Sequence, residues 1–339
     1  MGSGGDELRI IHEIEIALFR EFKKICEKHN LRYYAIQGTT LGAIFWKGFI
    51  PWDDDMDIGM PISDYERFLS VIKKELPSEY AFLELGWYGG KLHNPNTTFI
   101  ESSDLSNPNI WHGVFIDIVP LIALPDNENE RKCFFDEIRA YHLASLKSIR
   151  YPREATDNKK NLKEWRSSLL HRYTYGETQY ITDFSFGYYY MFKTDGFRNA
   201  AIMDFCSEKI PVSSTYDFDL KSRYGIYEKY PQKKNRVAHN SFSIVDLKSP
   251  YQKYEEEMRN IPRWIKDGIE KSRDVEGVYY SSFQWLKKQY EDEKSYNHQI
   301  LNTKEYKLGK LLLRYPRKSL AAYRRLIHKI SQKVQHGHK

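Results

Sequence analysis

One acidic segment constrains the fold of this chain more than any other stretch. Residues 50–60 read IPWDDDMDIGM, so four carboxylates stand between two groups of apolar residues. Alternate residues of a β-strand lie on one face, which predicts that Asp53, Asp55 and Asp57 project together. Asp54 would then face away. Carboxylates on one face repel one another, and a hard divalent cation that prefers oxygen ligands would relieve the repulsion. A solvated acidic turn is the alternative interpretation.

A further carboxylate stands in a second apolar stretch. Residues 113–119 read GVFIDIV, which predicts a strand with Asp117 on the face opposite Ile116. A lone carboxylate in such a strand is costly unless something pairs with it. We therefore expect Asp117 to join Asp55 and Asp57, because phosphoryl and nucleotidyl transfer require carboxylates around divalent cations. A buried acid satisfied by hydrogen bonds alone is the alternative.

The residues just before the acidic segment suit a phosphate group. Gly38, Thr39 and Thr40 lead into a run of helical character that continues to about Trp46. The first turn of a helix offers backbone N–H groups and the positive end of the helix dipole to an anion. A plain helix cap without a ligand is the alternative, and the acids that follow favour the phosphate interpretation.

Helical and β-prone segments alternate over the first 120 residues, and from residue 127 the pattern is mainly helical. This predicts an α+β fold, a mixed sheet with flanking helices, followed by a mainly helical C-terminal region. The helices expected are 7–29, 39–46, 63–76, 128–149, 199–208 and 219–230. The strands expected are 32–36, 50–60, 80–87, 97–102, 113–119 and 241–246, with an irregular aromatic stretch over 173–192.

The length of 339 residues allows about two domains. We predict a catalytic core over 6–125, a mainly helical substrate-binding region over 126–303 that completes the same domain, and a basic tail over 304–339. No apolar run reaches the ~18 residues of a transmembrane helix. The three cysteines fit neither a disulfide framework nor a zinc site. These features predict a cytoplasmic protein.

The positive charge of the chain is concentrated in the tail. The net charge is +6, but residues 304–339 hold eleven Lys/Arg and one acid, so the tail carries +10 and the rest of the chain −4. The acidic body argues against a nucleic-acid partner. Between residues 317 and 336, apolar residues recur at helical spacing beside basic ones, as in a helix lying on an anionic membrane surface. That surface would be the inner face of a bacterial plasma membrane. A helix packed on the body with a solvated basic face is the alternative.

Five segments in order carry a resemblance to a known family, and the acidic run with its Pro-Trp lead is the most specific of them. They read GTTLGA at 38–43, KGFIPWDDDMDIGM at 47–60, NTTFIE at 96–101, FIDIVPL at 115–121, and RYG at 223–225 with Pro231 and His239 beyond it. Over about residues 30–240 the chain thereby resembles the LicD family of the nucleotidyltransferase-fold superfamily, which includes the fukutin-related proteins.

The resemblance implies a nucleotidyltransferase-like core and a transferase activity. LicD proteins move a phospho-alcohol, typically phosphocholine, from a CDP-linked donor such as CDP-choline. The acceptor is a hydroxyl of a cell-surface glycan or a teichoic-acid-type precursor, often built on a lipid carrier. The cofactor implied is Mg²⁺ or Mn²⁺.

The resemblance also assigns site residues by position. Asp55 and Asp57 would hold the metal, and Asp117 would be the third carboxylate, as a metal ligand or as the base for the acceptor hydroxyl. Asp53 matches the first acid of the family and is included among the metal ligands. The candidates for contact with the donor are Gly38, Thr39, Thr40, Lys91 and His239. For Lys91 a surface role, and for His239 a structural role, are the alternatives.

One departure from the family concerns Phe45-Trp46, where family members commonly carry Arg-His. Two aromatic rings replace a positive pair near the phosphates, so Lys47 or Lys91 would have to supply the charge. The aromatic residues between 173 and 192 could cage a quaternary ammonium or stack on sugars. Aromatic core packing is the favoured interpretation of that stretch.

Three functions remain open on the sequence alone. Transfer of a phospho-alcohol from a CDP-linked donor is favoured, because the acids and the ordered motifs agree. A nucleotidyltransferase that moves NMP to a small molecule or a protein would use the same acids. A non-catalytic, membrane-associated scaffold would keep the fold without the reaction.

Overall fold

The computed structural model of the chain describes residues 4–86, 89–101, 112–150, 159–185, 189–229 and 242–256. Contacts divide the chain into two units, residues 1–258 and 259–339, and every described residue belongs to the first unit. The predicted basic tail over 304–339 and the candidate His239 lie outside the described residues. No helix of the described part is long and apolar enough to span a membrane.

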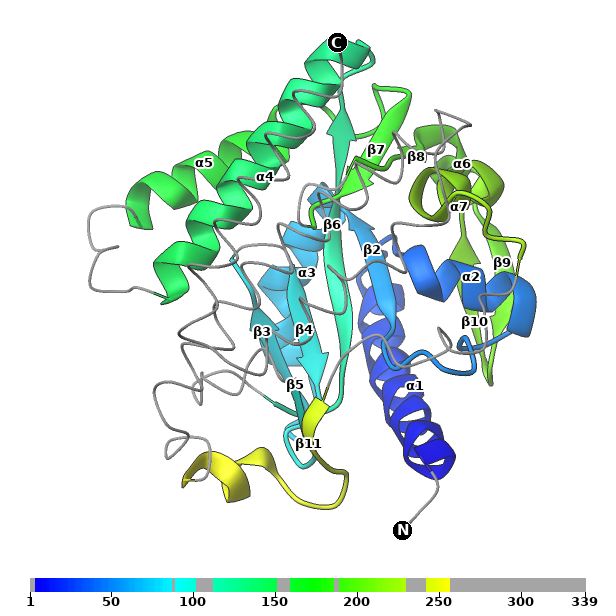
Figure 1. The fold of residues 1–339 in the computed structure, drawn as a ribbon, viewed down its shortest axis with the longest axis vertical. Helices are drawn as coiled ribbons and strands as arrows, with labels where there is room; N and C mark the ends of the chain where they lie inside the picture. Colours follow the sequence, from blue (N-terminus) through cyan, green and yellow to red (C-terminus); the bar gives the residue numbers. More distant parts are fainter. Residues whose placement is uncertain are drawn as a thin grey trace, which may run out of the picture. The chain divides into compact units, whose positions relative to one another are not determined.

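A mixed sheet organises the described residues (Figure 1). Its strands run in the order β3-β4-β6-β2-β1-β10-β9, and β7 pairs with both β6 and β8. The strands are β1 (Tyr34–Ala35), β2 (Asp57–Pro61), β3 (Ala81–Glu84), β4 (Gly90–His93), β6 (Phe115–Leu124), β7 (Tyr180–Asp183), β8 (Phe192–Lys193), β9 (Ala201–Phe205) and β10 (Glu208–Val212). A separate two-stranded sheet pairs β5 (Thr98–Glu101) with β11 (Phe242–Asp246).

The strand β6 lies at the centre of this arrangement. All ten of its residues are buried, and it pairs in parallel with β2 so that Asp57 lies opposite Asp117. On its other side, its first half pairs with β4 and its second half with β7, both antiparallel. The two predicted acid-bearing segments are therefore neighbours in one sheet.

Helices cover the sheet, as the α+β prediction requires. The helices are α1 (Gly4–Lys28), α2 (Gln37–Trp46), α3 (Ile62–Glu75), α4 (Glu128–Arg150), α5 (Lys159–His171), α6 (Thr194–Arg198) and α7 (Tyr216–Tyr224), with a 3₁₀ turn at Tyr251–Tyr254. The largest core cluster joins apolar residues of α1, α3, α4 and α5 to residues such as Ile116 and Ile118 of β6. A second cluster on the alternate residues, including Val119 and Leu121, packs against β7, β8 and α6. Asp117 shares this second face, as the alternation predicts.

Three predicted elements are wrong in their type or bounds, and one of them is the helix expected over 219–230, which lies at Tyr216–Tyr224. The segment 199–208 was expected to be helical, but it forms most of the β9–β10 hairpin, which turns at Cys206 with a φ of 54°. Its residues alternate between more and less exposed positions, which is the period of a strand. The acidic strand begins only at Asp57, and residues 53–56 form an irregular lead into it.

Candidate active site

Three carboxylates meet where β2 and β6 run side by side. One oxygen each from Asp55, Asp57 and Asp117 lies within 4.8 Å of the other two. The register sets this meeting, because Asp57 and Asp117 are direct partners in the parallel pair. The backbone N–H of Asp117 also donates to the carbonyl of Met56 at 2.8 Å. Side chains from segments about 60 residues apart therefore converge through backbone pairing.

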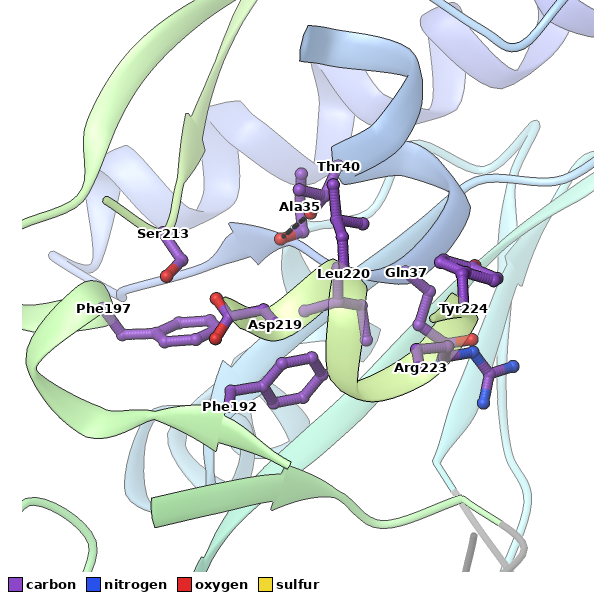
Figure 2. A pocket seen from close by; sticks show the side chains of 11 residues that line it. Ala35, Gln37, Thr40, Phe192, Phe197, Ser213, Asp219, Leu220, Arg223 and Tyr224 are labelled. Atoms are coloured by element: carbon purple, nitrogen blue, oxygen red, sulfur yellow. Dashed lines mark hydrogen bonds between the residues drawn. The ribbon is translucent and has the colours of Figure 1, made fainter. Parts of the chain in front are cut away.

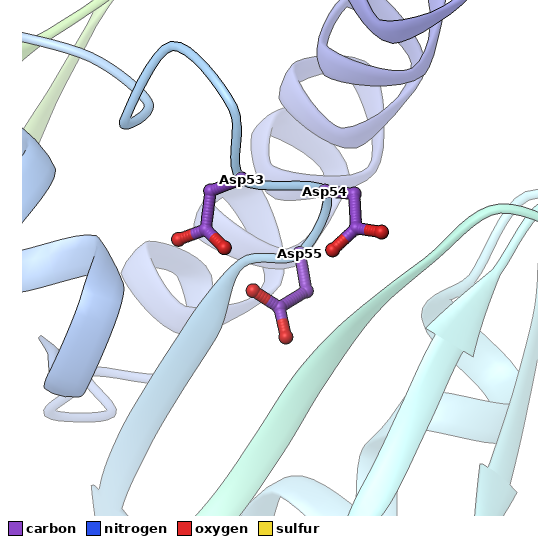
Figure 3. Close-up of side chains that lie close together, drawn as sticks. All are labelled: Asp53, Asp54 and Asp55. Atoms are coloured by element: carbon purple, nitrogen blue, oxygen red, sulfur yellow. The ribbon is translucent and has the colours of Figure 1, made fainter. Parts of the chain in front are cut away.

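A second group of acids adjoins the first and shares Asp55 with it. One oxygen each from Asp53, Asp54 and Asp55 lies within 4.8 Å of the other two, and Figure 3 shows all three side chains on the turn before β2. Asp53 therefore groups with its sequence neighbours. The expectation that Asp54 faces away is wrong, because these residues are not in a strand and do not alternate.

The electrostatics of both groups favour a bound cation. Burial and the negative charges of Asp55 and Asp117 raise the pKa of Asp57 well above its usual value. Burial and the charges of Asp55 and Asp54 raise the pKa of Asp53 to about 8. Both shifts mean that the carboxylate charges are poorly compensated by the protein itself. An all-carboxylate donor set of this kind fits a hard divalent cation such as Mg²⁺ or Mn²⁺.

The predicted phosphate turn lies beside these acids. Helix α2 begins at Gln37 without a side-chain cap, and a Cβ added to Gly38 would stand 2.9 Å from Oδ2 of Asp53. The start of the helix therefore faces the acidic turn. The two threonines have structural partners: Oγ1 of Thr39 accepts from the N–H of Asp57 at 2.8 Å, and Thr40 donates to the carbonyl of Ala35 at 2.9 Å.

Lys91 lies next to the third carboxylate. It is opposite Asp117 in the β4–β6 pair, and its Nζ is 3.6 Å from Oδ1 of Asp117. The same ammonium lies 3.2 Å from the centre of the Phe115 ring. A cation that was predicted to contact the donor is thus placed at the edge of the acid group.

Arg223 is a site residue that the sequence reasoning quoted only as part of a motif. It extends from α7 beside a pocket lined by residues of β1, α2, β8, α6 and α7, with Gln37 and Tyr224 nearby (Figure 2). Its positive charge acts to lower the pKa of Asp57, against the larger effects that raise it. Its guanidinium also lies 4.4 Å from the centre of the Tyr190 ring.

A buried carboxylate supports this arrangement. Asp183 accepts a hydrogen bond from Nε2 of Gln37 at 2.9 Å and further hydrogen bonds from the hydroxyls of Ser185 and Tyr190. Burial raises the pKa of Asp183, and the charge of Arg223 offsets part of that shift. The Arg223-Tyr224-Gly225 motif was the sequence signal that pointed to Arg223. No local pattern, however, shows which strand a residue on a helix will face.

The aromatic residues are divided between the core and a partly exposed group. Tyr190 is buried and bonded to Asp183, and the hydroxyl of Tyr189 donates to Asp136, so these two tyrosines are engaged in packing and hydrogen bonds. A contiguous set of rings instead includes Phe45 and Trp46, the two residues that depart from the family pattern. Its neighbouring ring centres lie 5.7–6.0 Å apart in the order Tyr227, Phe45, Trp46 and Trp52.

A mixed sheet with flanking helices, presenting acids from two adjacent parallel strands, defines a nucleotidyltransferase-like domain. Comparison with known proteins agrees. Residues 30–156 match the family model described as LicD/FKTN/FKRP, nucleotidyltransferase domain. The resemblance to the LicD family that the motifs predict is thereby confirmed.

Three curated relatives define the extent of the similarity. The lipopolysaccharide cholinephosphotransferase LicD of Haemophilus influenzae is 24% identical over 247 residues, which cover 65% of this chain and 90% of that protein. An uncharacterized protein of Rickettsia typhi is 36% identical over 55 residues, 16% of this chain and 18% of its own length. An uncharacterized protein of Rickettsia prowazekii is 40% identical over 47 residues, 14% and 18% of the two chains.

Proposed function

We propose that this protein transfers a phospho-alcohol, with phosphocholine as the first candidate, from a CDP-linked donor to a hydroxyl of a cell-surface glycan. The observation that carries the proposal is the convergence of Asp55, Asp57 and Asp117 beside the start of α2. Similarity to a lipopolysaccharide cholinephosphotransferase over most of that protein supports the choice of phosphocholine and of a glycan acceptor.

In the proposed reaction, the acceptor hydroxyl attacks the phosphorus that carries the alcohol. The bond from that phosphorus to the CMP oxygen breaks, CMP leaves, and a carboxylate of the site takes up the hydroxyl proton. The residues that would hold Mg²⁺ or Mn²⁺ are Asp55, Asp57 and Asp117, and the bound cation would neutralise phosphate charge and orient the leaving group. The start of α2 is placed to receive phosphate oxygens on backbone N–H groups.

Positive side chains would complete the donor site. Lys91 beside Asp117 and Arg223 near Asp57 are the described cations with the clearest relation to the acids. Both would balance phosphate charge at the acid group. The basic amphipathic stretch 317–336 would keep the enzyme near a lipid-linked acceptor at the inner face of the membrane, as part of the same proposal.

The test is an Asp57→Asn variant assayed for CMP release from CDP-choline with Mg²⁺ and a lipopolysaccharide-type saccharide acceptor. Loss of even an outer partner of a metal ligand costs about 10–100-fold, so loss of a ligand charge should lower turnover by at least about 100-fold. The control is Asp204→Asn, an exposed acid on the β9–β10 hairpin paired with Lys209. Wild-type turnover in Asp57→Asn would refute the assignment.

The identity of the product separates the alternatives. CMP release indicates phospho-alcohol transfer, whereas pyrophosphate release from an NTP would indicate nucleotidyl transfer. A thermal-shift panel of CDP-choline, CDP-ribitol, CDP-glycerol and CDP-ethanolamine identifies the alcohol, because a ligand that binds only the folded state raises apparent stability. Absence of any Mg²⁺-dependent shift with the panel or with NTPs would favour the scaffold.

A further inference from the structure

The first residue of helix α2 has a backbone conformation that its residue type rarely adopts. Gln37 has a φ of 50°, in the left-handed region that favours glycine, and such a conformation persists only where the surroundings hold it. One contact that holds it is a long-range hydrogen bond, in which Nε2 of Gln37 donates to Oδ2 of Asp183 at 2.9 Å. A carboxylate at the end of β7 therefore helps to fix the start of α2.

Asp183 is itself held from several sides. It is the last residue of β7, it lies opposite Leu121 of β6, and its exposure is 2%. The hydroxyls of Ser185 and Tyr190 donate to its two oxygens, in addition to the bond from α2. Hydrogen bonds to a carboxylate are stronger than those between neutral groups. The orientation of this carboxylate is therefore well defined.

One of these donors also contacts the cation of α7. The guanidinium of Arg223 lies over the ring of Tyr190, 4.4 Å from the ring centre, which is a cation–π contact. Tyr190 is 3% exposed and its hydroxyl is bonded to Asp183, so its ring is fixed at both ends. The position of Arg223 is thus tied to Asp183 through a single side chain.

The two elements that Asp183 holds are both suited to phosphate. The start of α2 offers backbone N–H groups, and the planar guanidinium of Arg223 matches the geometry of phosphate oxygens. Gln37 and Arg223 line one pocket (Figure 2). The charge of Arg223 acts on Asp57 as well as on Asp183, so this pair of elements lies close to the acid group.

The strain at Gln37 distinguishes these contacts from ordinary packing. Glycine or asparagine would adopt a φ of 50° at lower cost, but neither has a side chain long enough to replace the bond to Asp183. Glutamine is thus unfavourable for the backbone here and necessary for the hydrogen bond. Residues held in strained conformations by their surroundings are concentrated at functional sites.

We propose that Asp183 is a positioning residue for the diphosphate group of the donor, because it orients the start of α2 through Gln37 and orients Arg223 through Tyr190. Both elements would then reach the phosphates of one ligand. This inference rests on the proposed function, which makes the donor a nucleoside diphosphate compound. Asp183 itself would touch neither the donor nor the cation held by the acid group.

The test measures the Kd of CDP for the full-length chain by calorimetry in the presence of Mg²⁺. Gln37→Asn suits the backbone but is one methylene too short to reach Asp183, and Tyr190→Phe keeps the ring but removes the hydroxyl. Each change should raise the Kd about tenfold, the scale of one hydrogen bond to a charged group. The matched controls are Gln179→Asn, at an exposed position, and Tyr189→Phe, whose hydroxyl is bonded to a different carboxylate. Both should bind CDP like the wild type.

Two further measurements separate positioning from a general loss of structure. The Kd of Mn²⁺ without nucleotide should be unchanged in Gln37→Asn and Tyr190→Phe, because the pairing of β2 with β6 that assembles the acids is intact. The KM for CDP-choline should rise with little change in kcat, as expected when an interaction made equally in the ground and transition states is lost. Weaker Mn²⁺ binding in step with weaker CDP binding would make the role structural and overturn the proposal. An unchanged Kd of CDP in both variants would also overturn it.

The wild type separates this inference from the proposed function. A wild-type chain that binds inorganic pyrophosphate but not CDP would contradict the nucleotide donor, and the same variants would then be compared with pyrophosphate. Binding of neither compound would overturn both proposals. Weaker CDP binding in the two variants, without any transfer from CDP-linked donors by the wild type, would support the positioning role and contradict the proposed reaction.

Discussion

Asp57 shows how one residue links the fold to the chemistry. Its backbone N–H donates to Oγ1 of Thr39, its Cα is paired with that of Asp117, and its carboxylate belongs to the acid group. The start of β2 is therefore anchored to α2 at the point where the acids gather. A change at Thr39 should thus act on stability and on the site together.

Replacement of Thr39 by valine tests this anchor. Valine keeps the shape but removes the oxygen that accepts the N–H of Asp57, and an unsatisfied buried donor costs about 1–3 kcal/mol. We expect the free energy of unfolding in urea to fall by that amount, with weaker Mn²⁺ binding. Thr174→Val, at an exposed loop position, should be within about 0.5 kcal/mol of the wild type. Equal stability of the two variants would contradict the anchoring role.

Sequence reasoning identified the residues whose position depends on strand alternation or on a motif. Asp55, Asp57 and Asp117 were expected together, and the structure brings them together. Asp54 was not expected in an acid group, but one of its oxygens lies close to those of Asp53 and Asp55. Glu15 reads as one polar position of an amphipathic helix, and only the packing of α1 brings it near enough for the charges of these acids to raise its pKa.

Among the elements, α2 is the one whose packing depends most on a missing side chain. A Cβ at Gly42 would lie 2.3 Å from the carbonyl oxygen of Gly48, and the N–H of Gly48 donates to the carbonyl of Gly42 at 3.4 Å. The middle of helix α2 therefore packs directly against the backbone at Gly48, in the loop that leads to the acidic turn. The close approach explains why this helix needs a small residue at its centre.

A Gly42→Ala variant should be destabilised although alanine is the better helix former. The clash is with backbone, which cannot rotate away, and overpacking of this kind costs about 1–3 kcal/mol. The measurement is the thermal midpoint, together with the unfolding free energy in urea. Gly86→Ala is the matched control, since a Cβ there meets nothing within 4 Å. A gain in stability for Gly42→Ala would refute the contact.

The elements show where local patterns are insufficient. The helices α1, α3 and α4 were predicted within a few residues because their apolar stripes are long. Segment 199–208 was assigned to the wrong type, because a five-residue strand carries too few alternations to compete with a helical interpretation. The short strands β4, β7 and β8 were not predicted. They are stabilised by pairing with β6 or with one another, and their own composition does not indicate a strand.

Two buried histidines make the stability of the whole molecule depend on pH. Burial lowers the pKa of both His93 and His142 to about 3, against an ordinary value near 6.5. Below pH 6.5 the unfolded chain therefore takes up protons that the folded chain does not bind. Stability due to each of these residues is full above pH 6.5 and falls by about 1.4 kcal/mol per pH unit between 6.5 and 3.

The His142→Gln variant isolates this effect. The acids with raised pKa values titrate in the opposite sense, so the informative quantity is the difference in unfolding free energy between wild type and variant. We expect that difference to shift by about 2 kcal/mol in favour of the variant between pH 7 and pH 5. A difference that stays flat between pH 7 and pH 5 for His142→Gln would contradict the assignment.

The pairing of β1 has a consequence for synthesis on the ribosome. Ala35 is joined to β2 within 25 residues along the chain, but its other partner, Val212, is made roughly 180 residues later. At about 5–20 residues per second, that interval lasts on the order of 10–35 seconds. During it, the nascent protein holds an open strand edge at β1, the feature by which unfinished sheets associate with one another. The β9–β10 hairpin is thus the part of the chain whose arrival closes the growing sheet on that side.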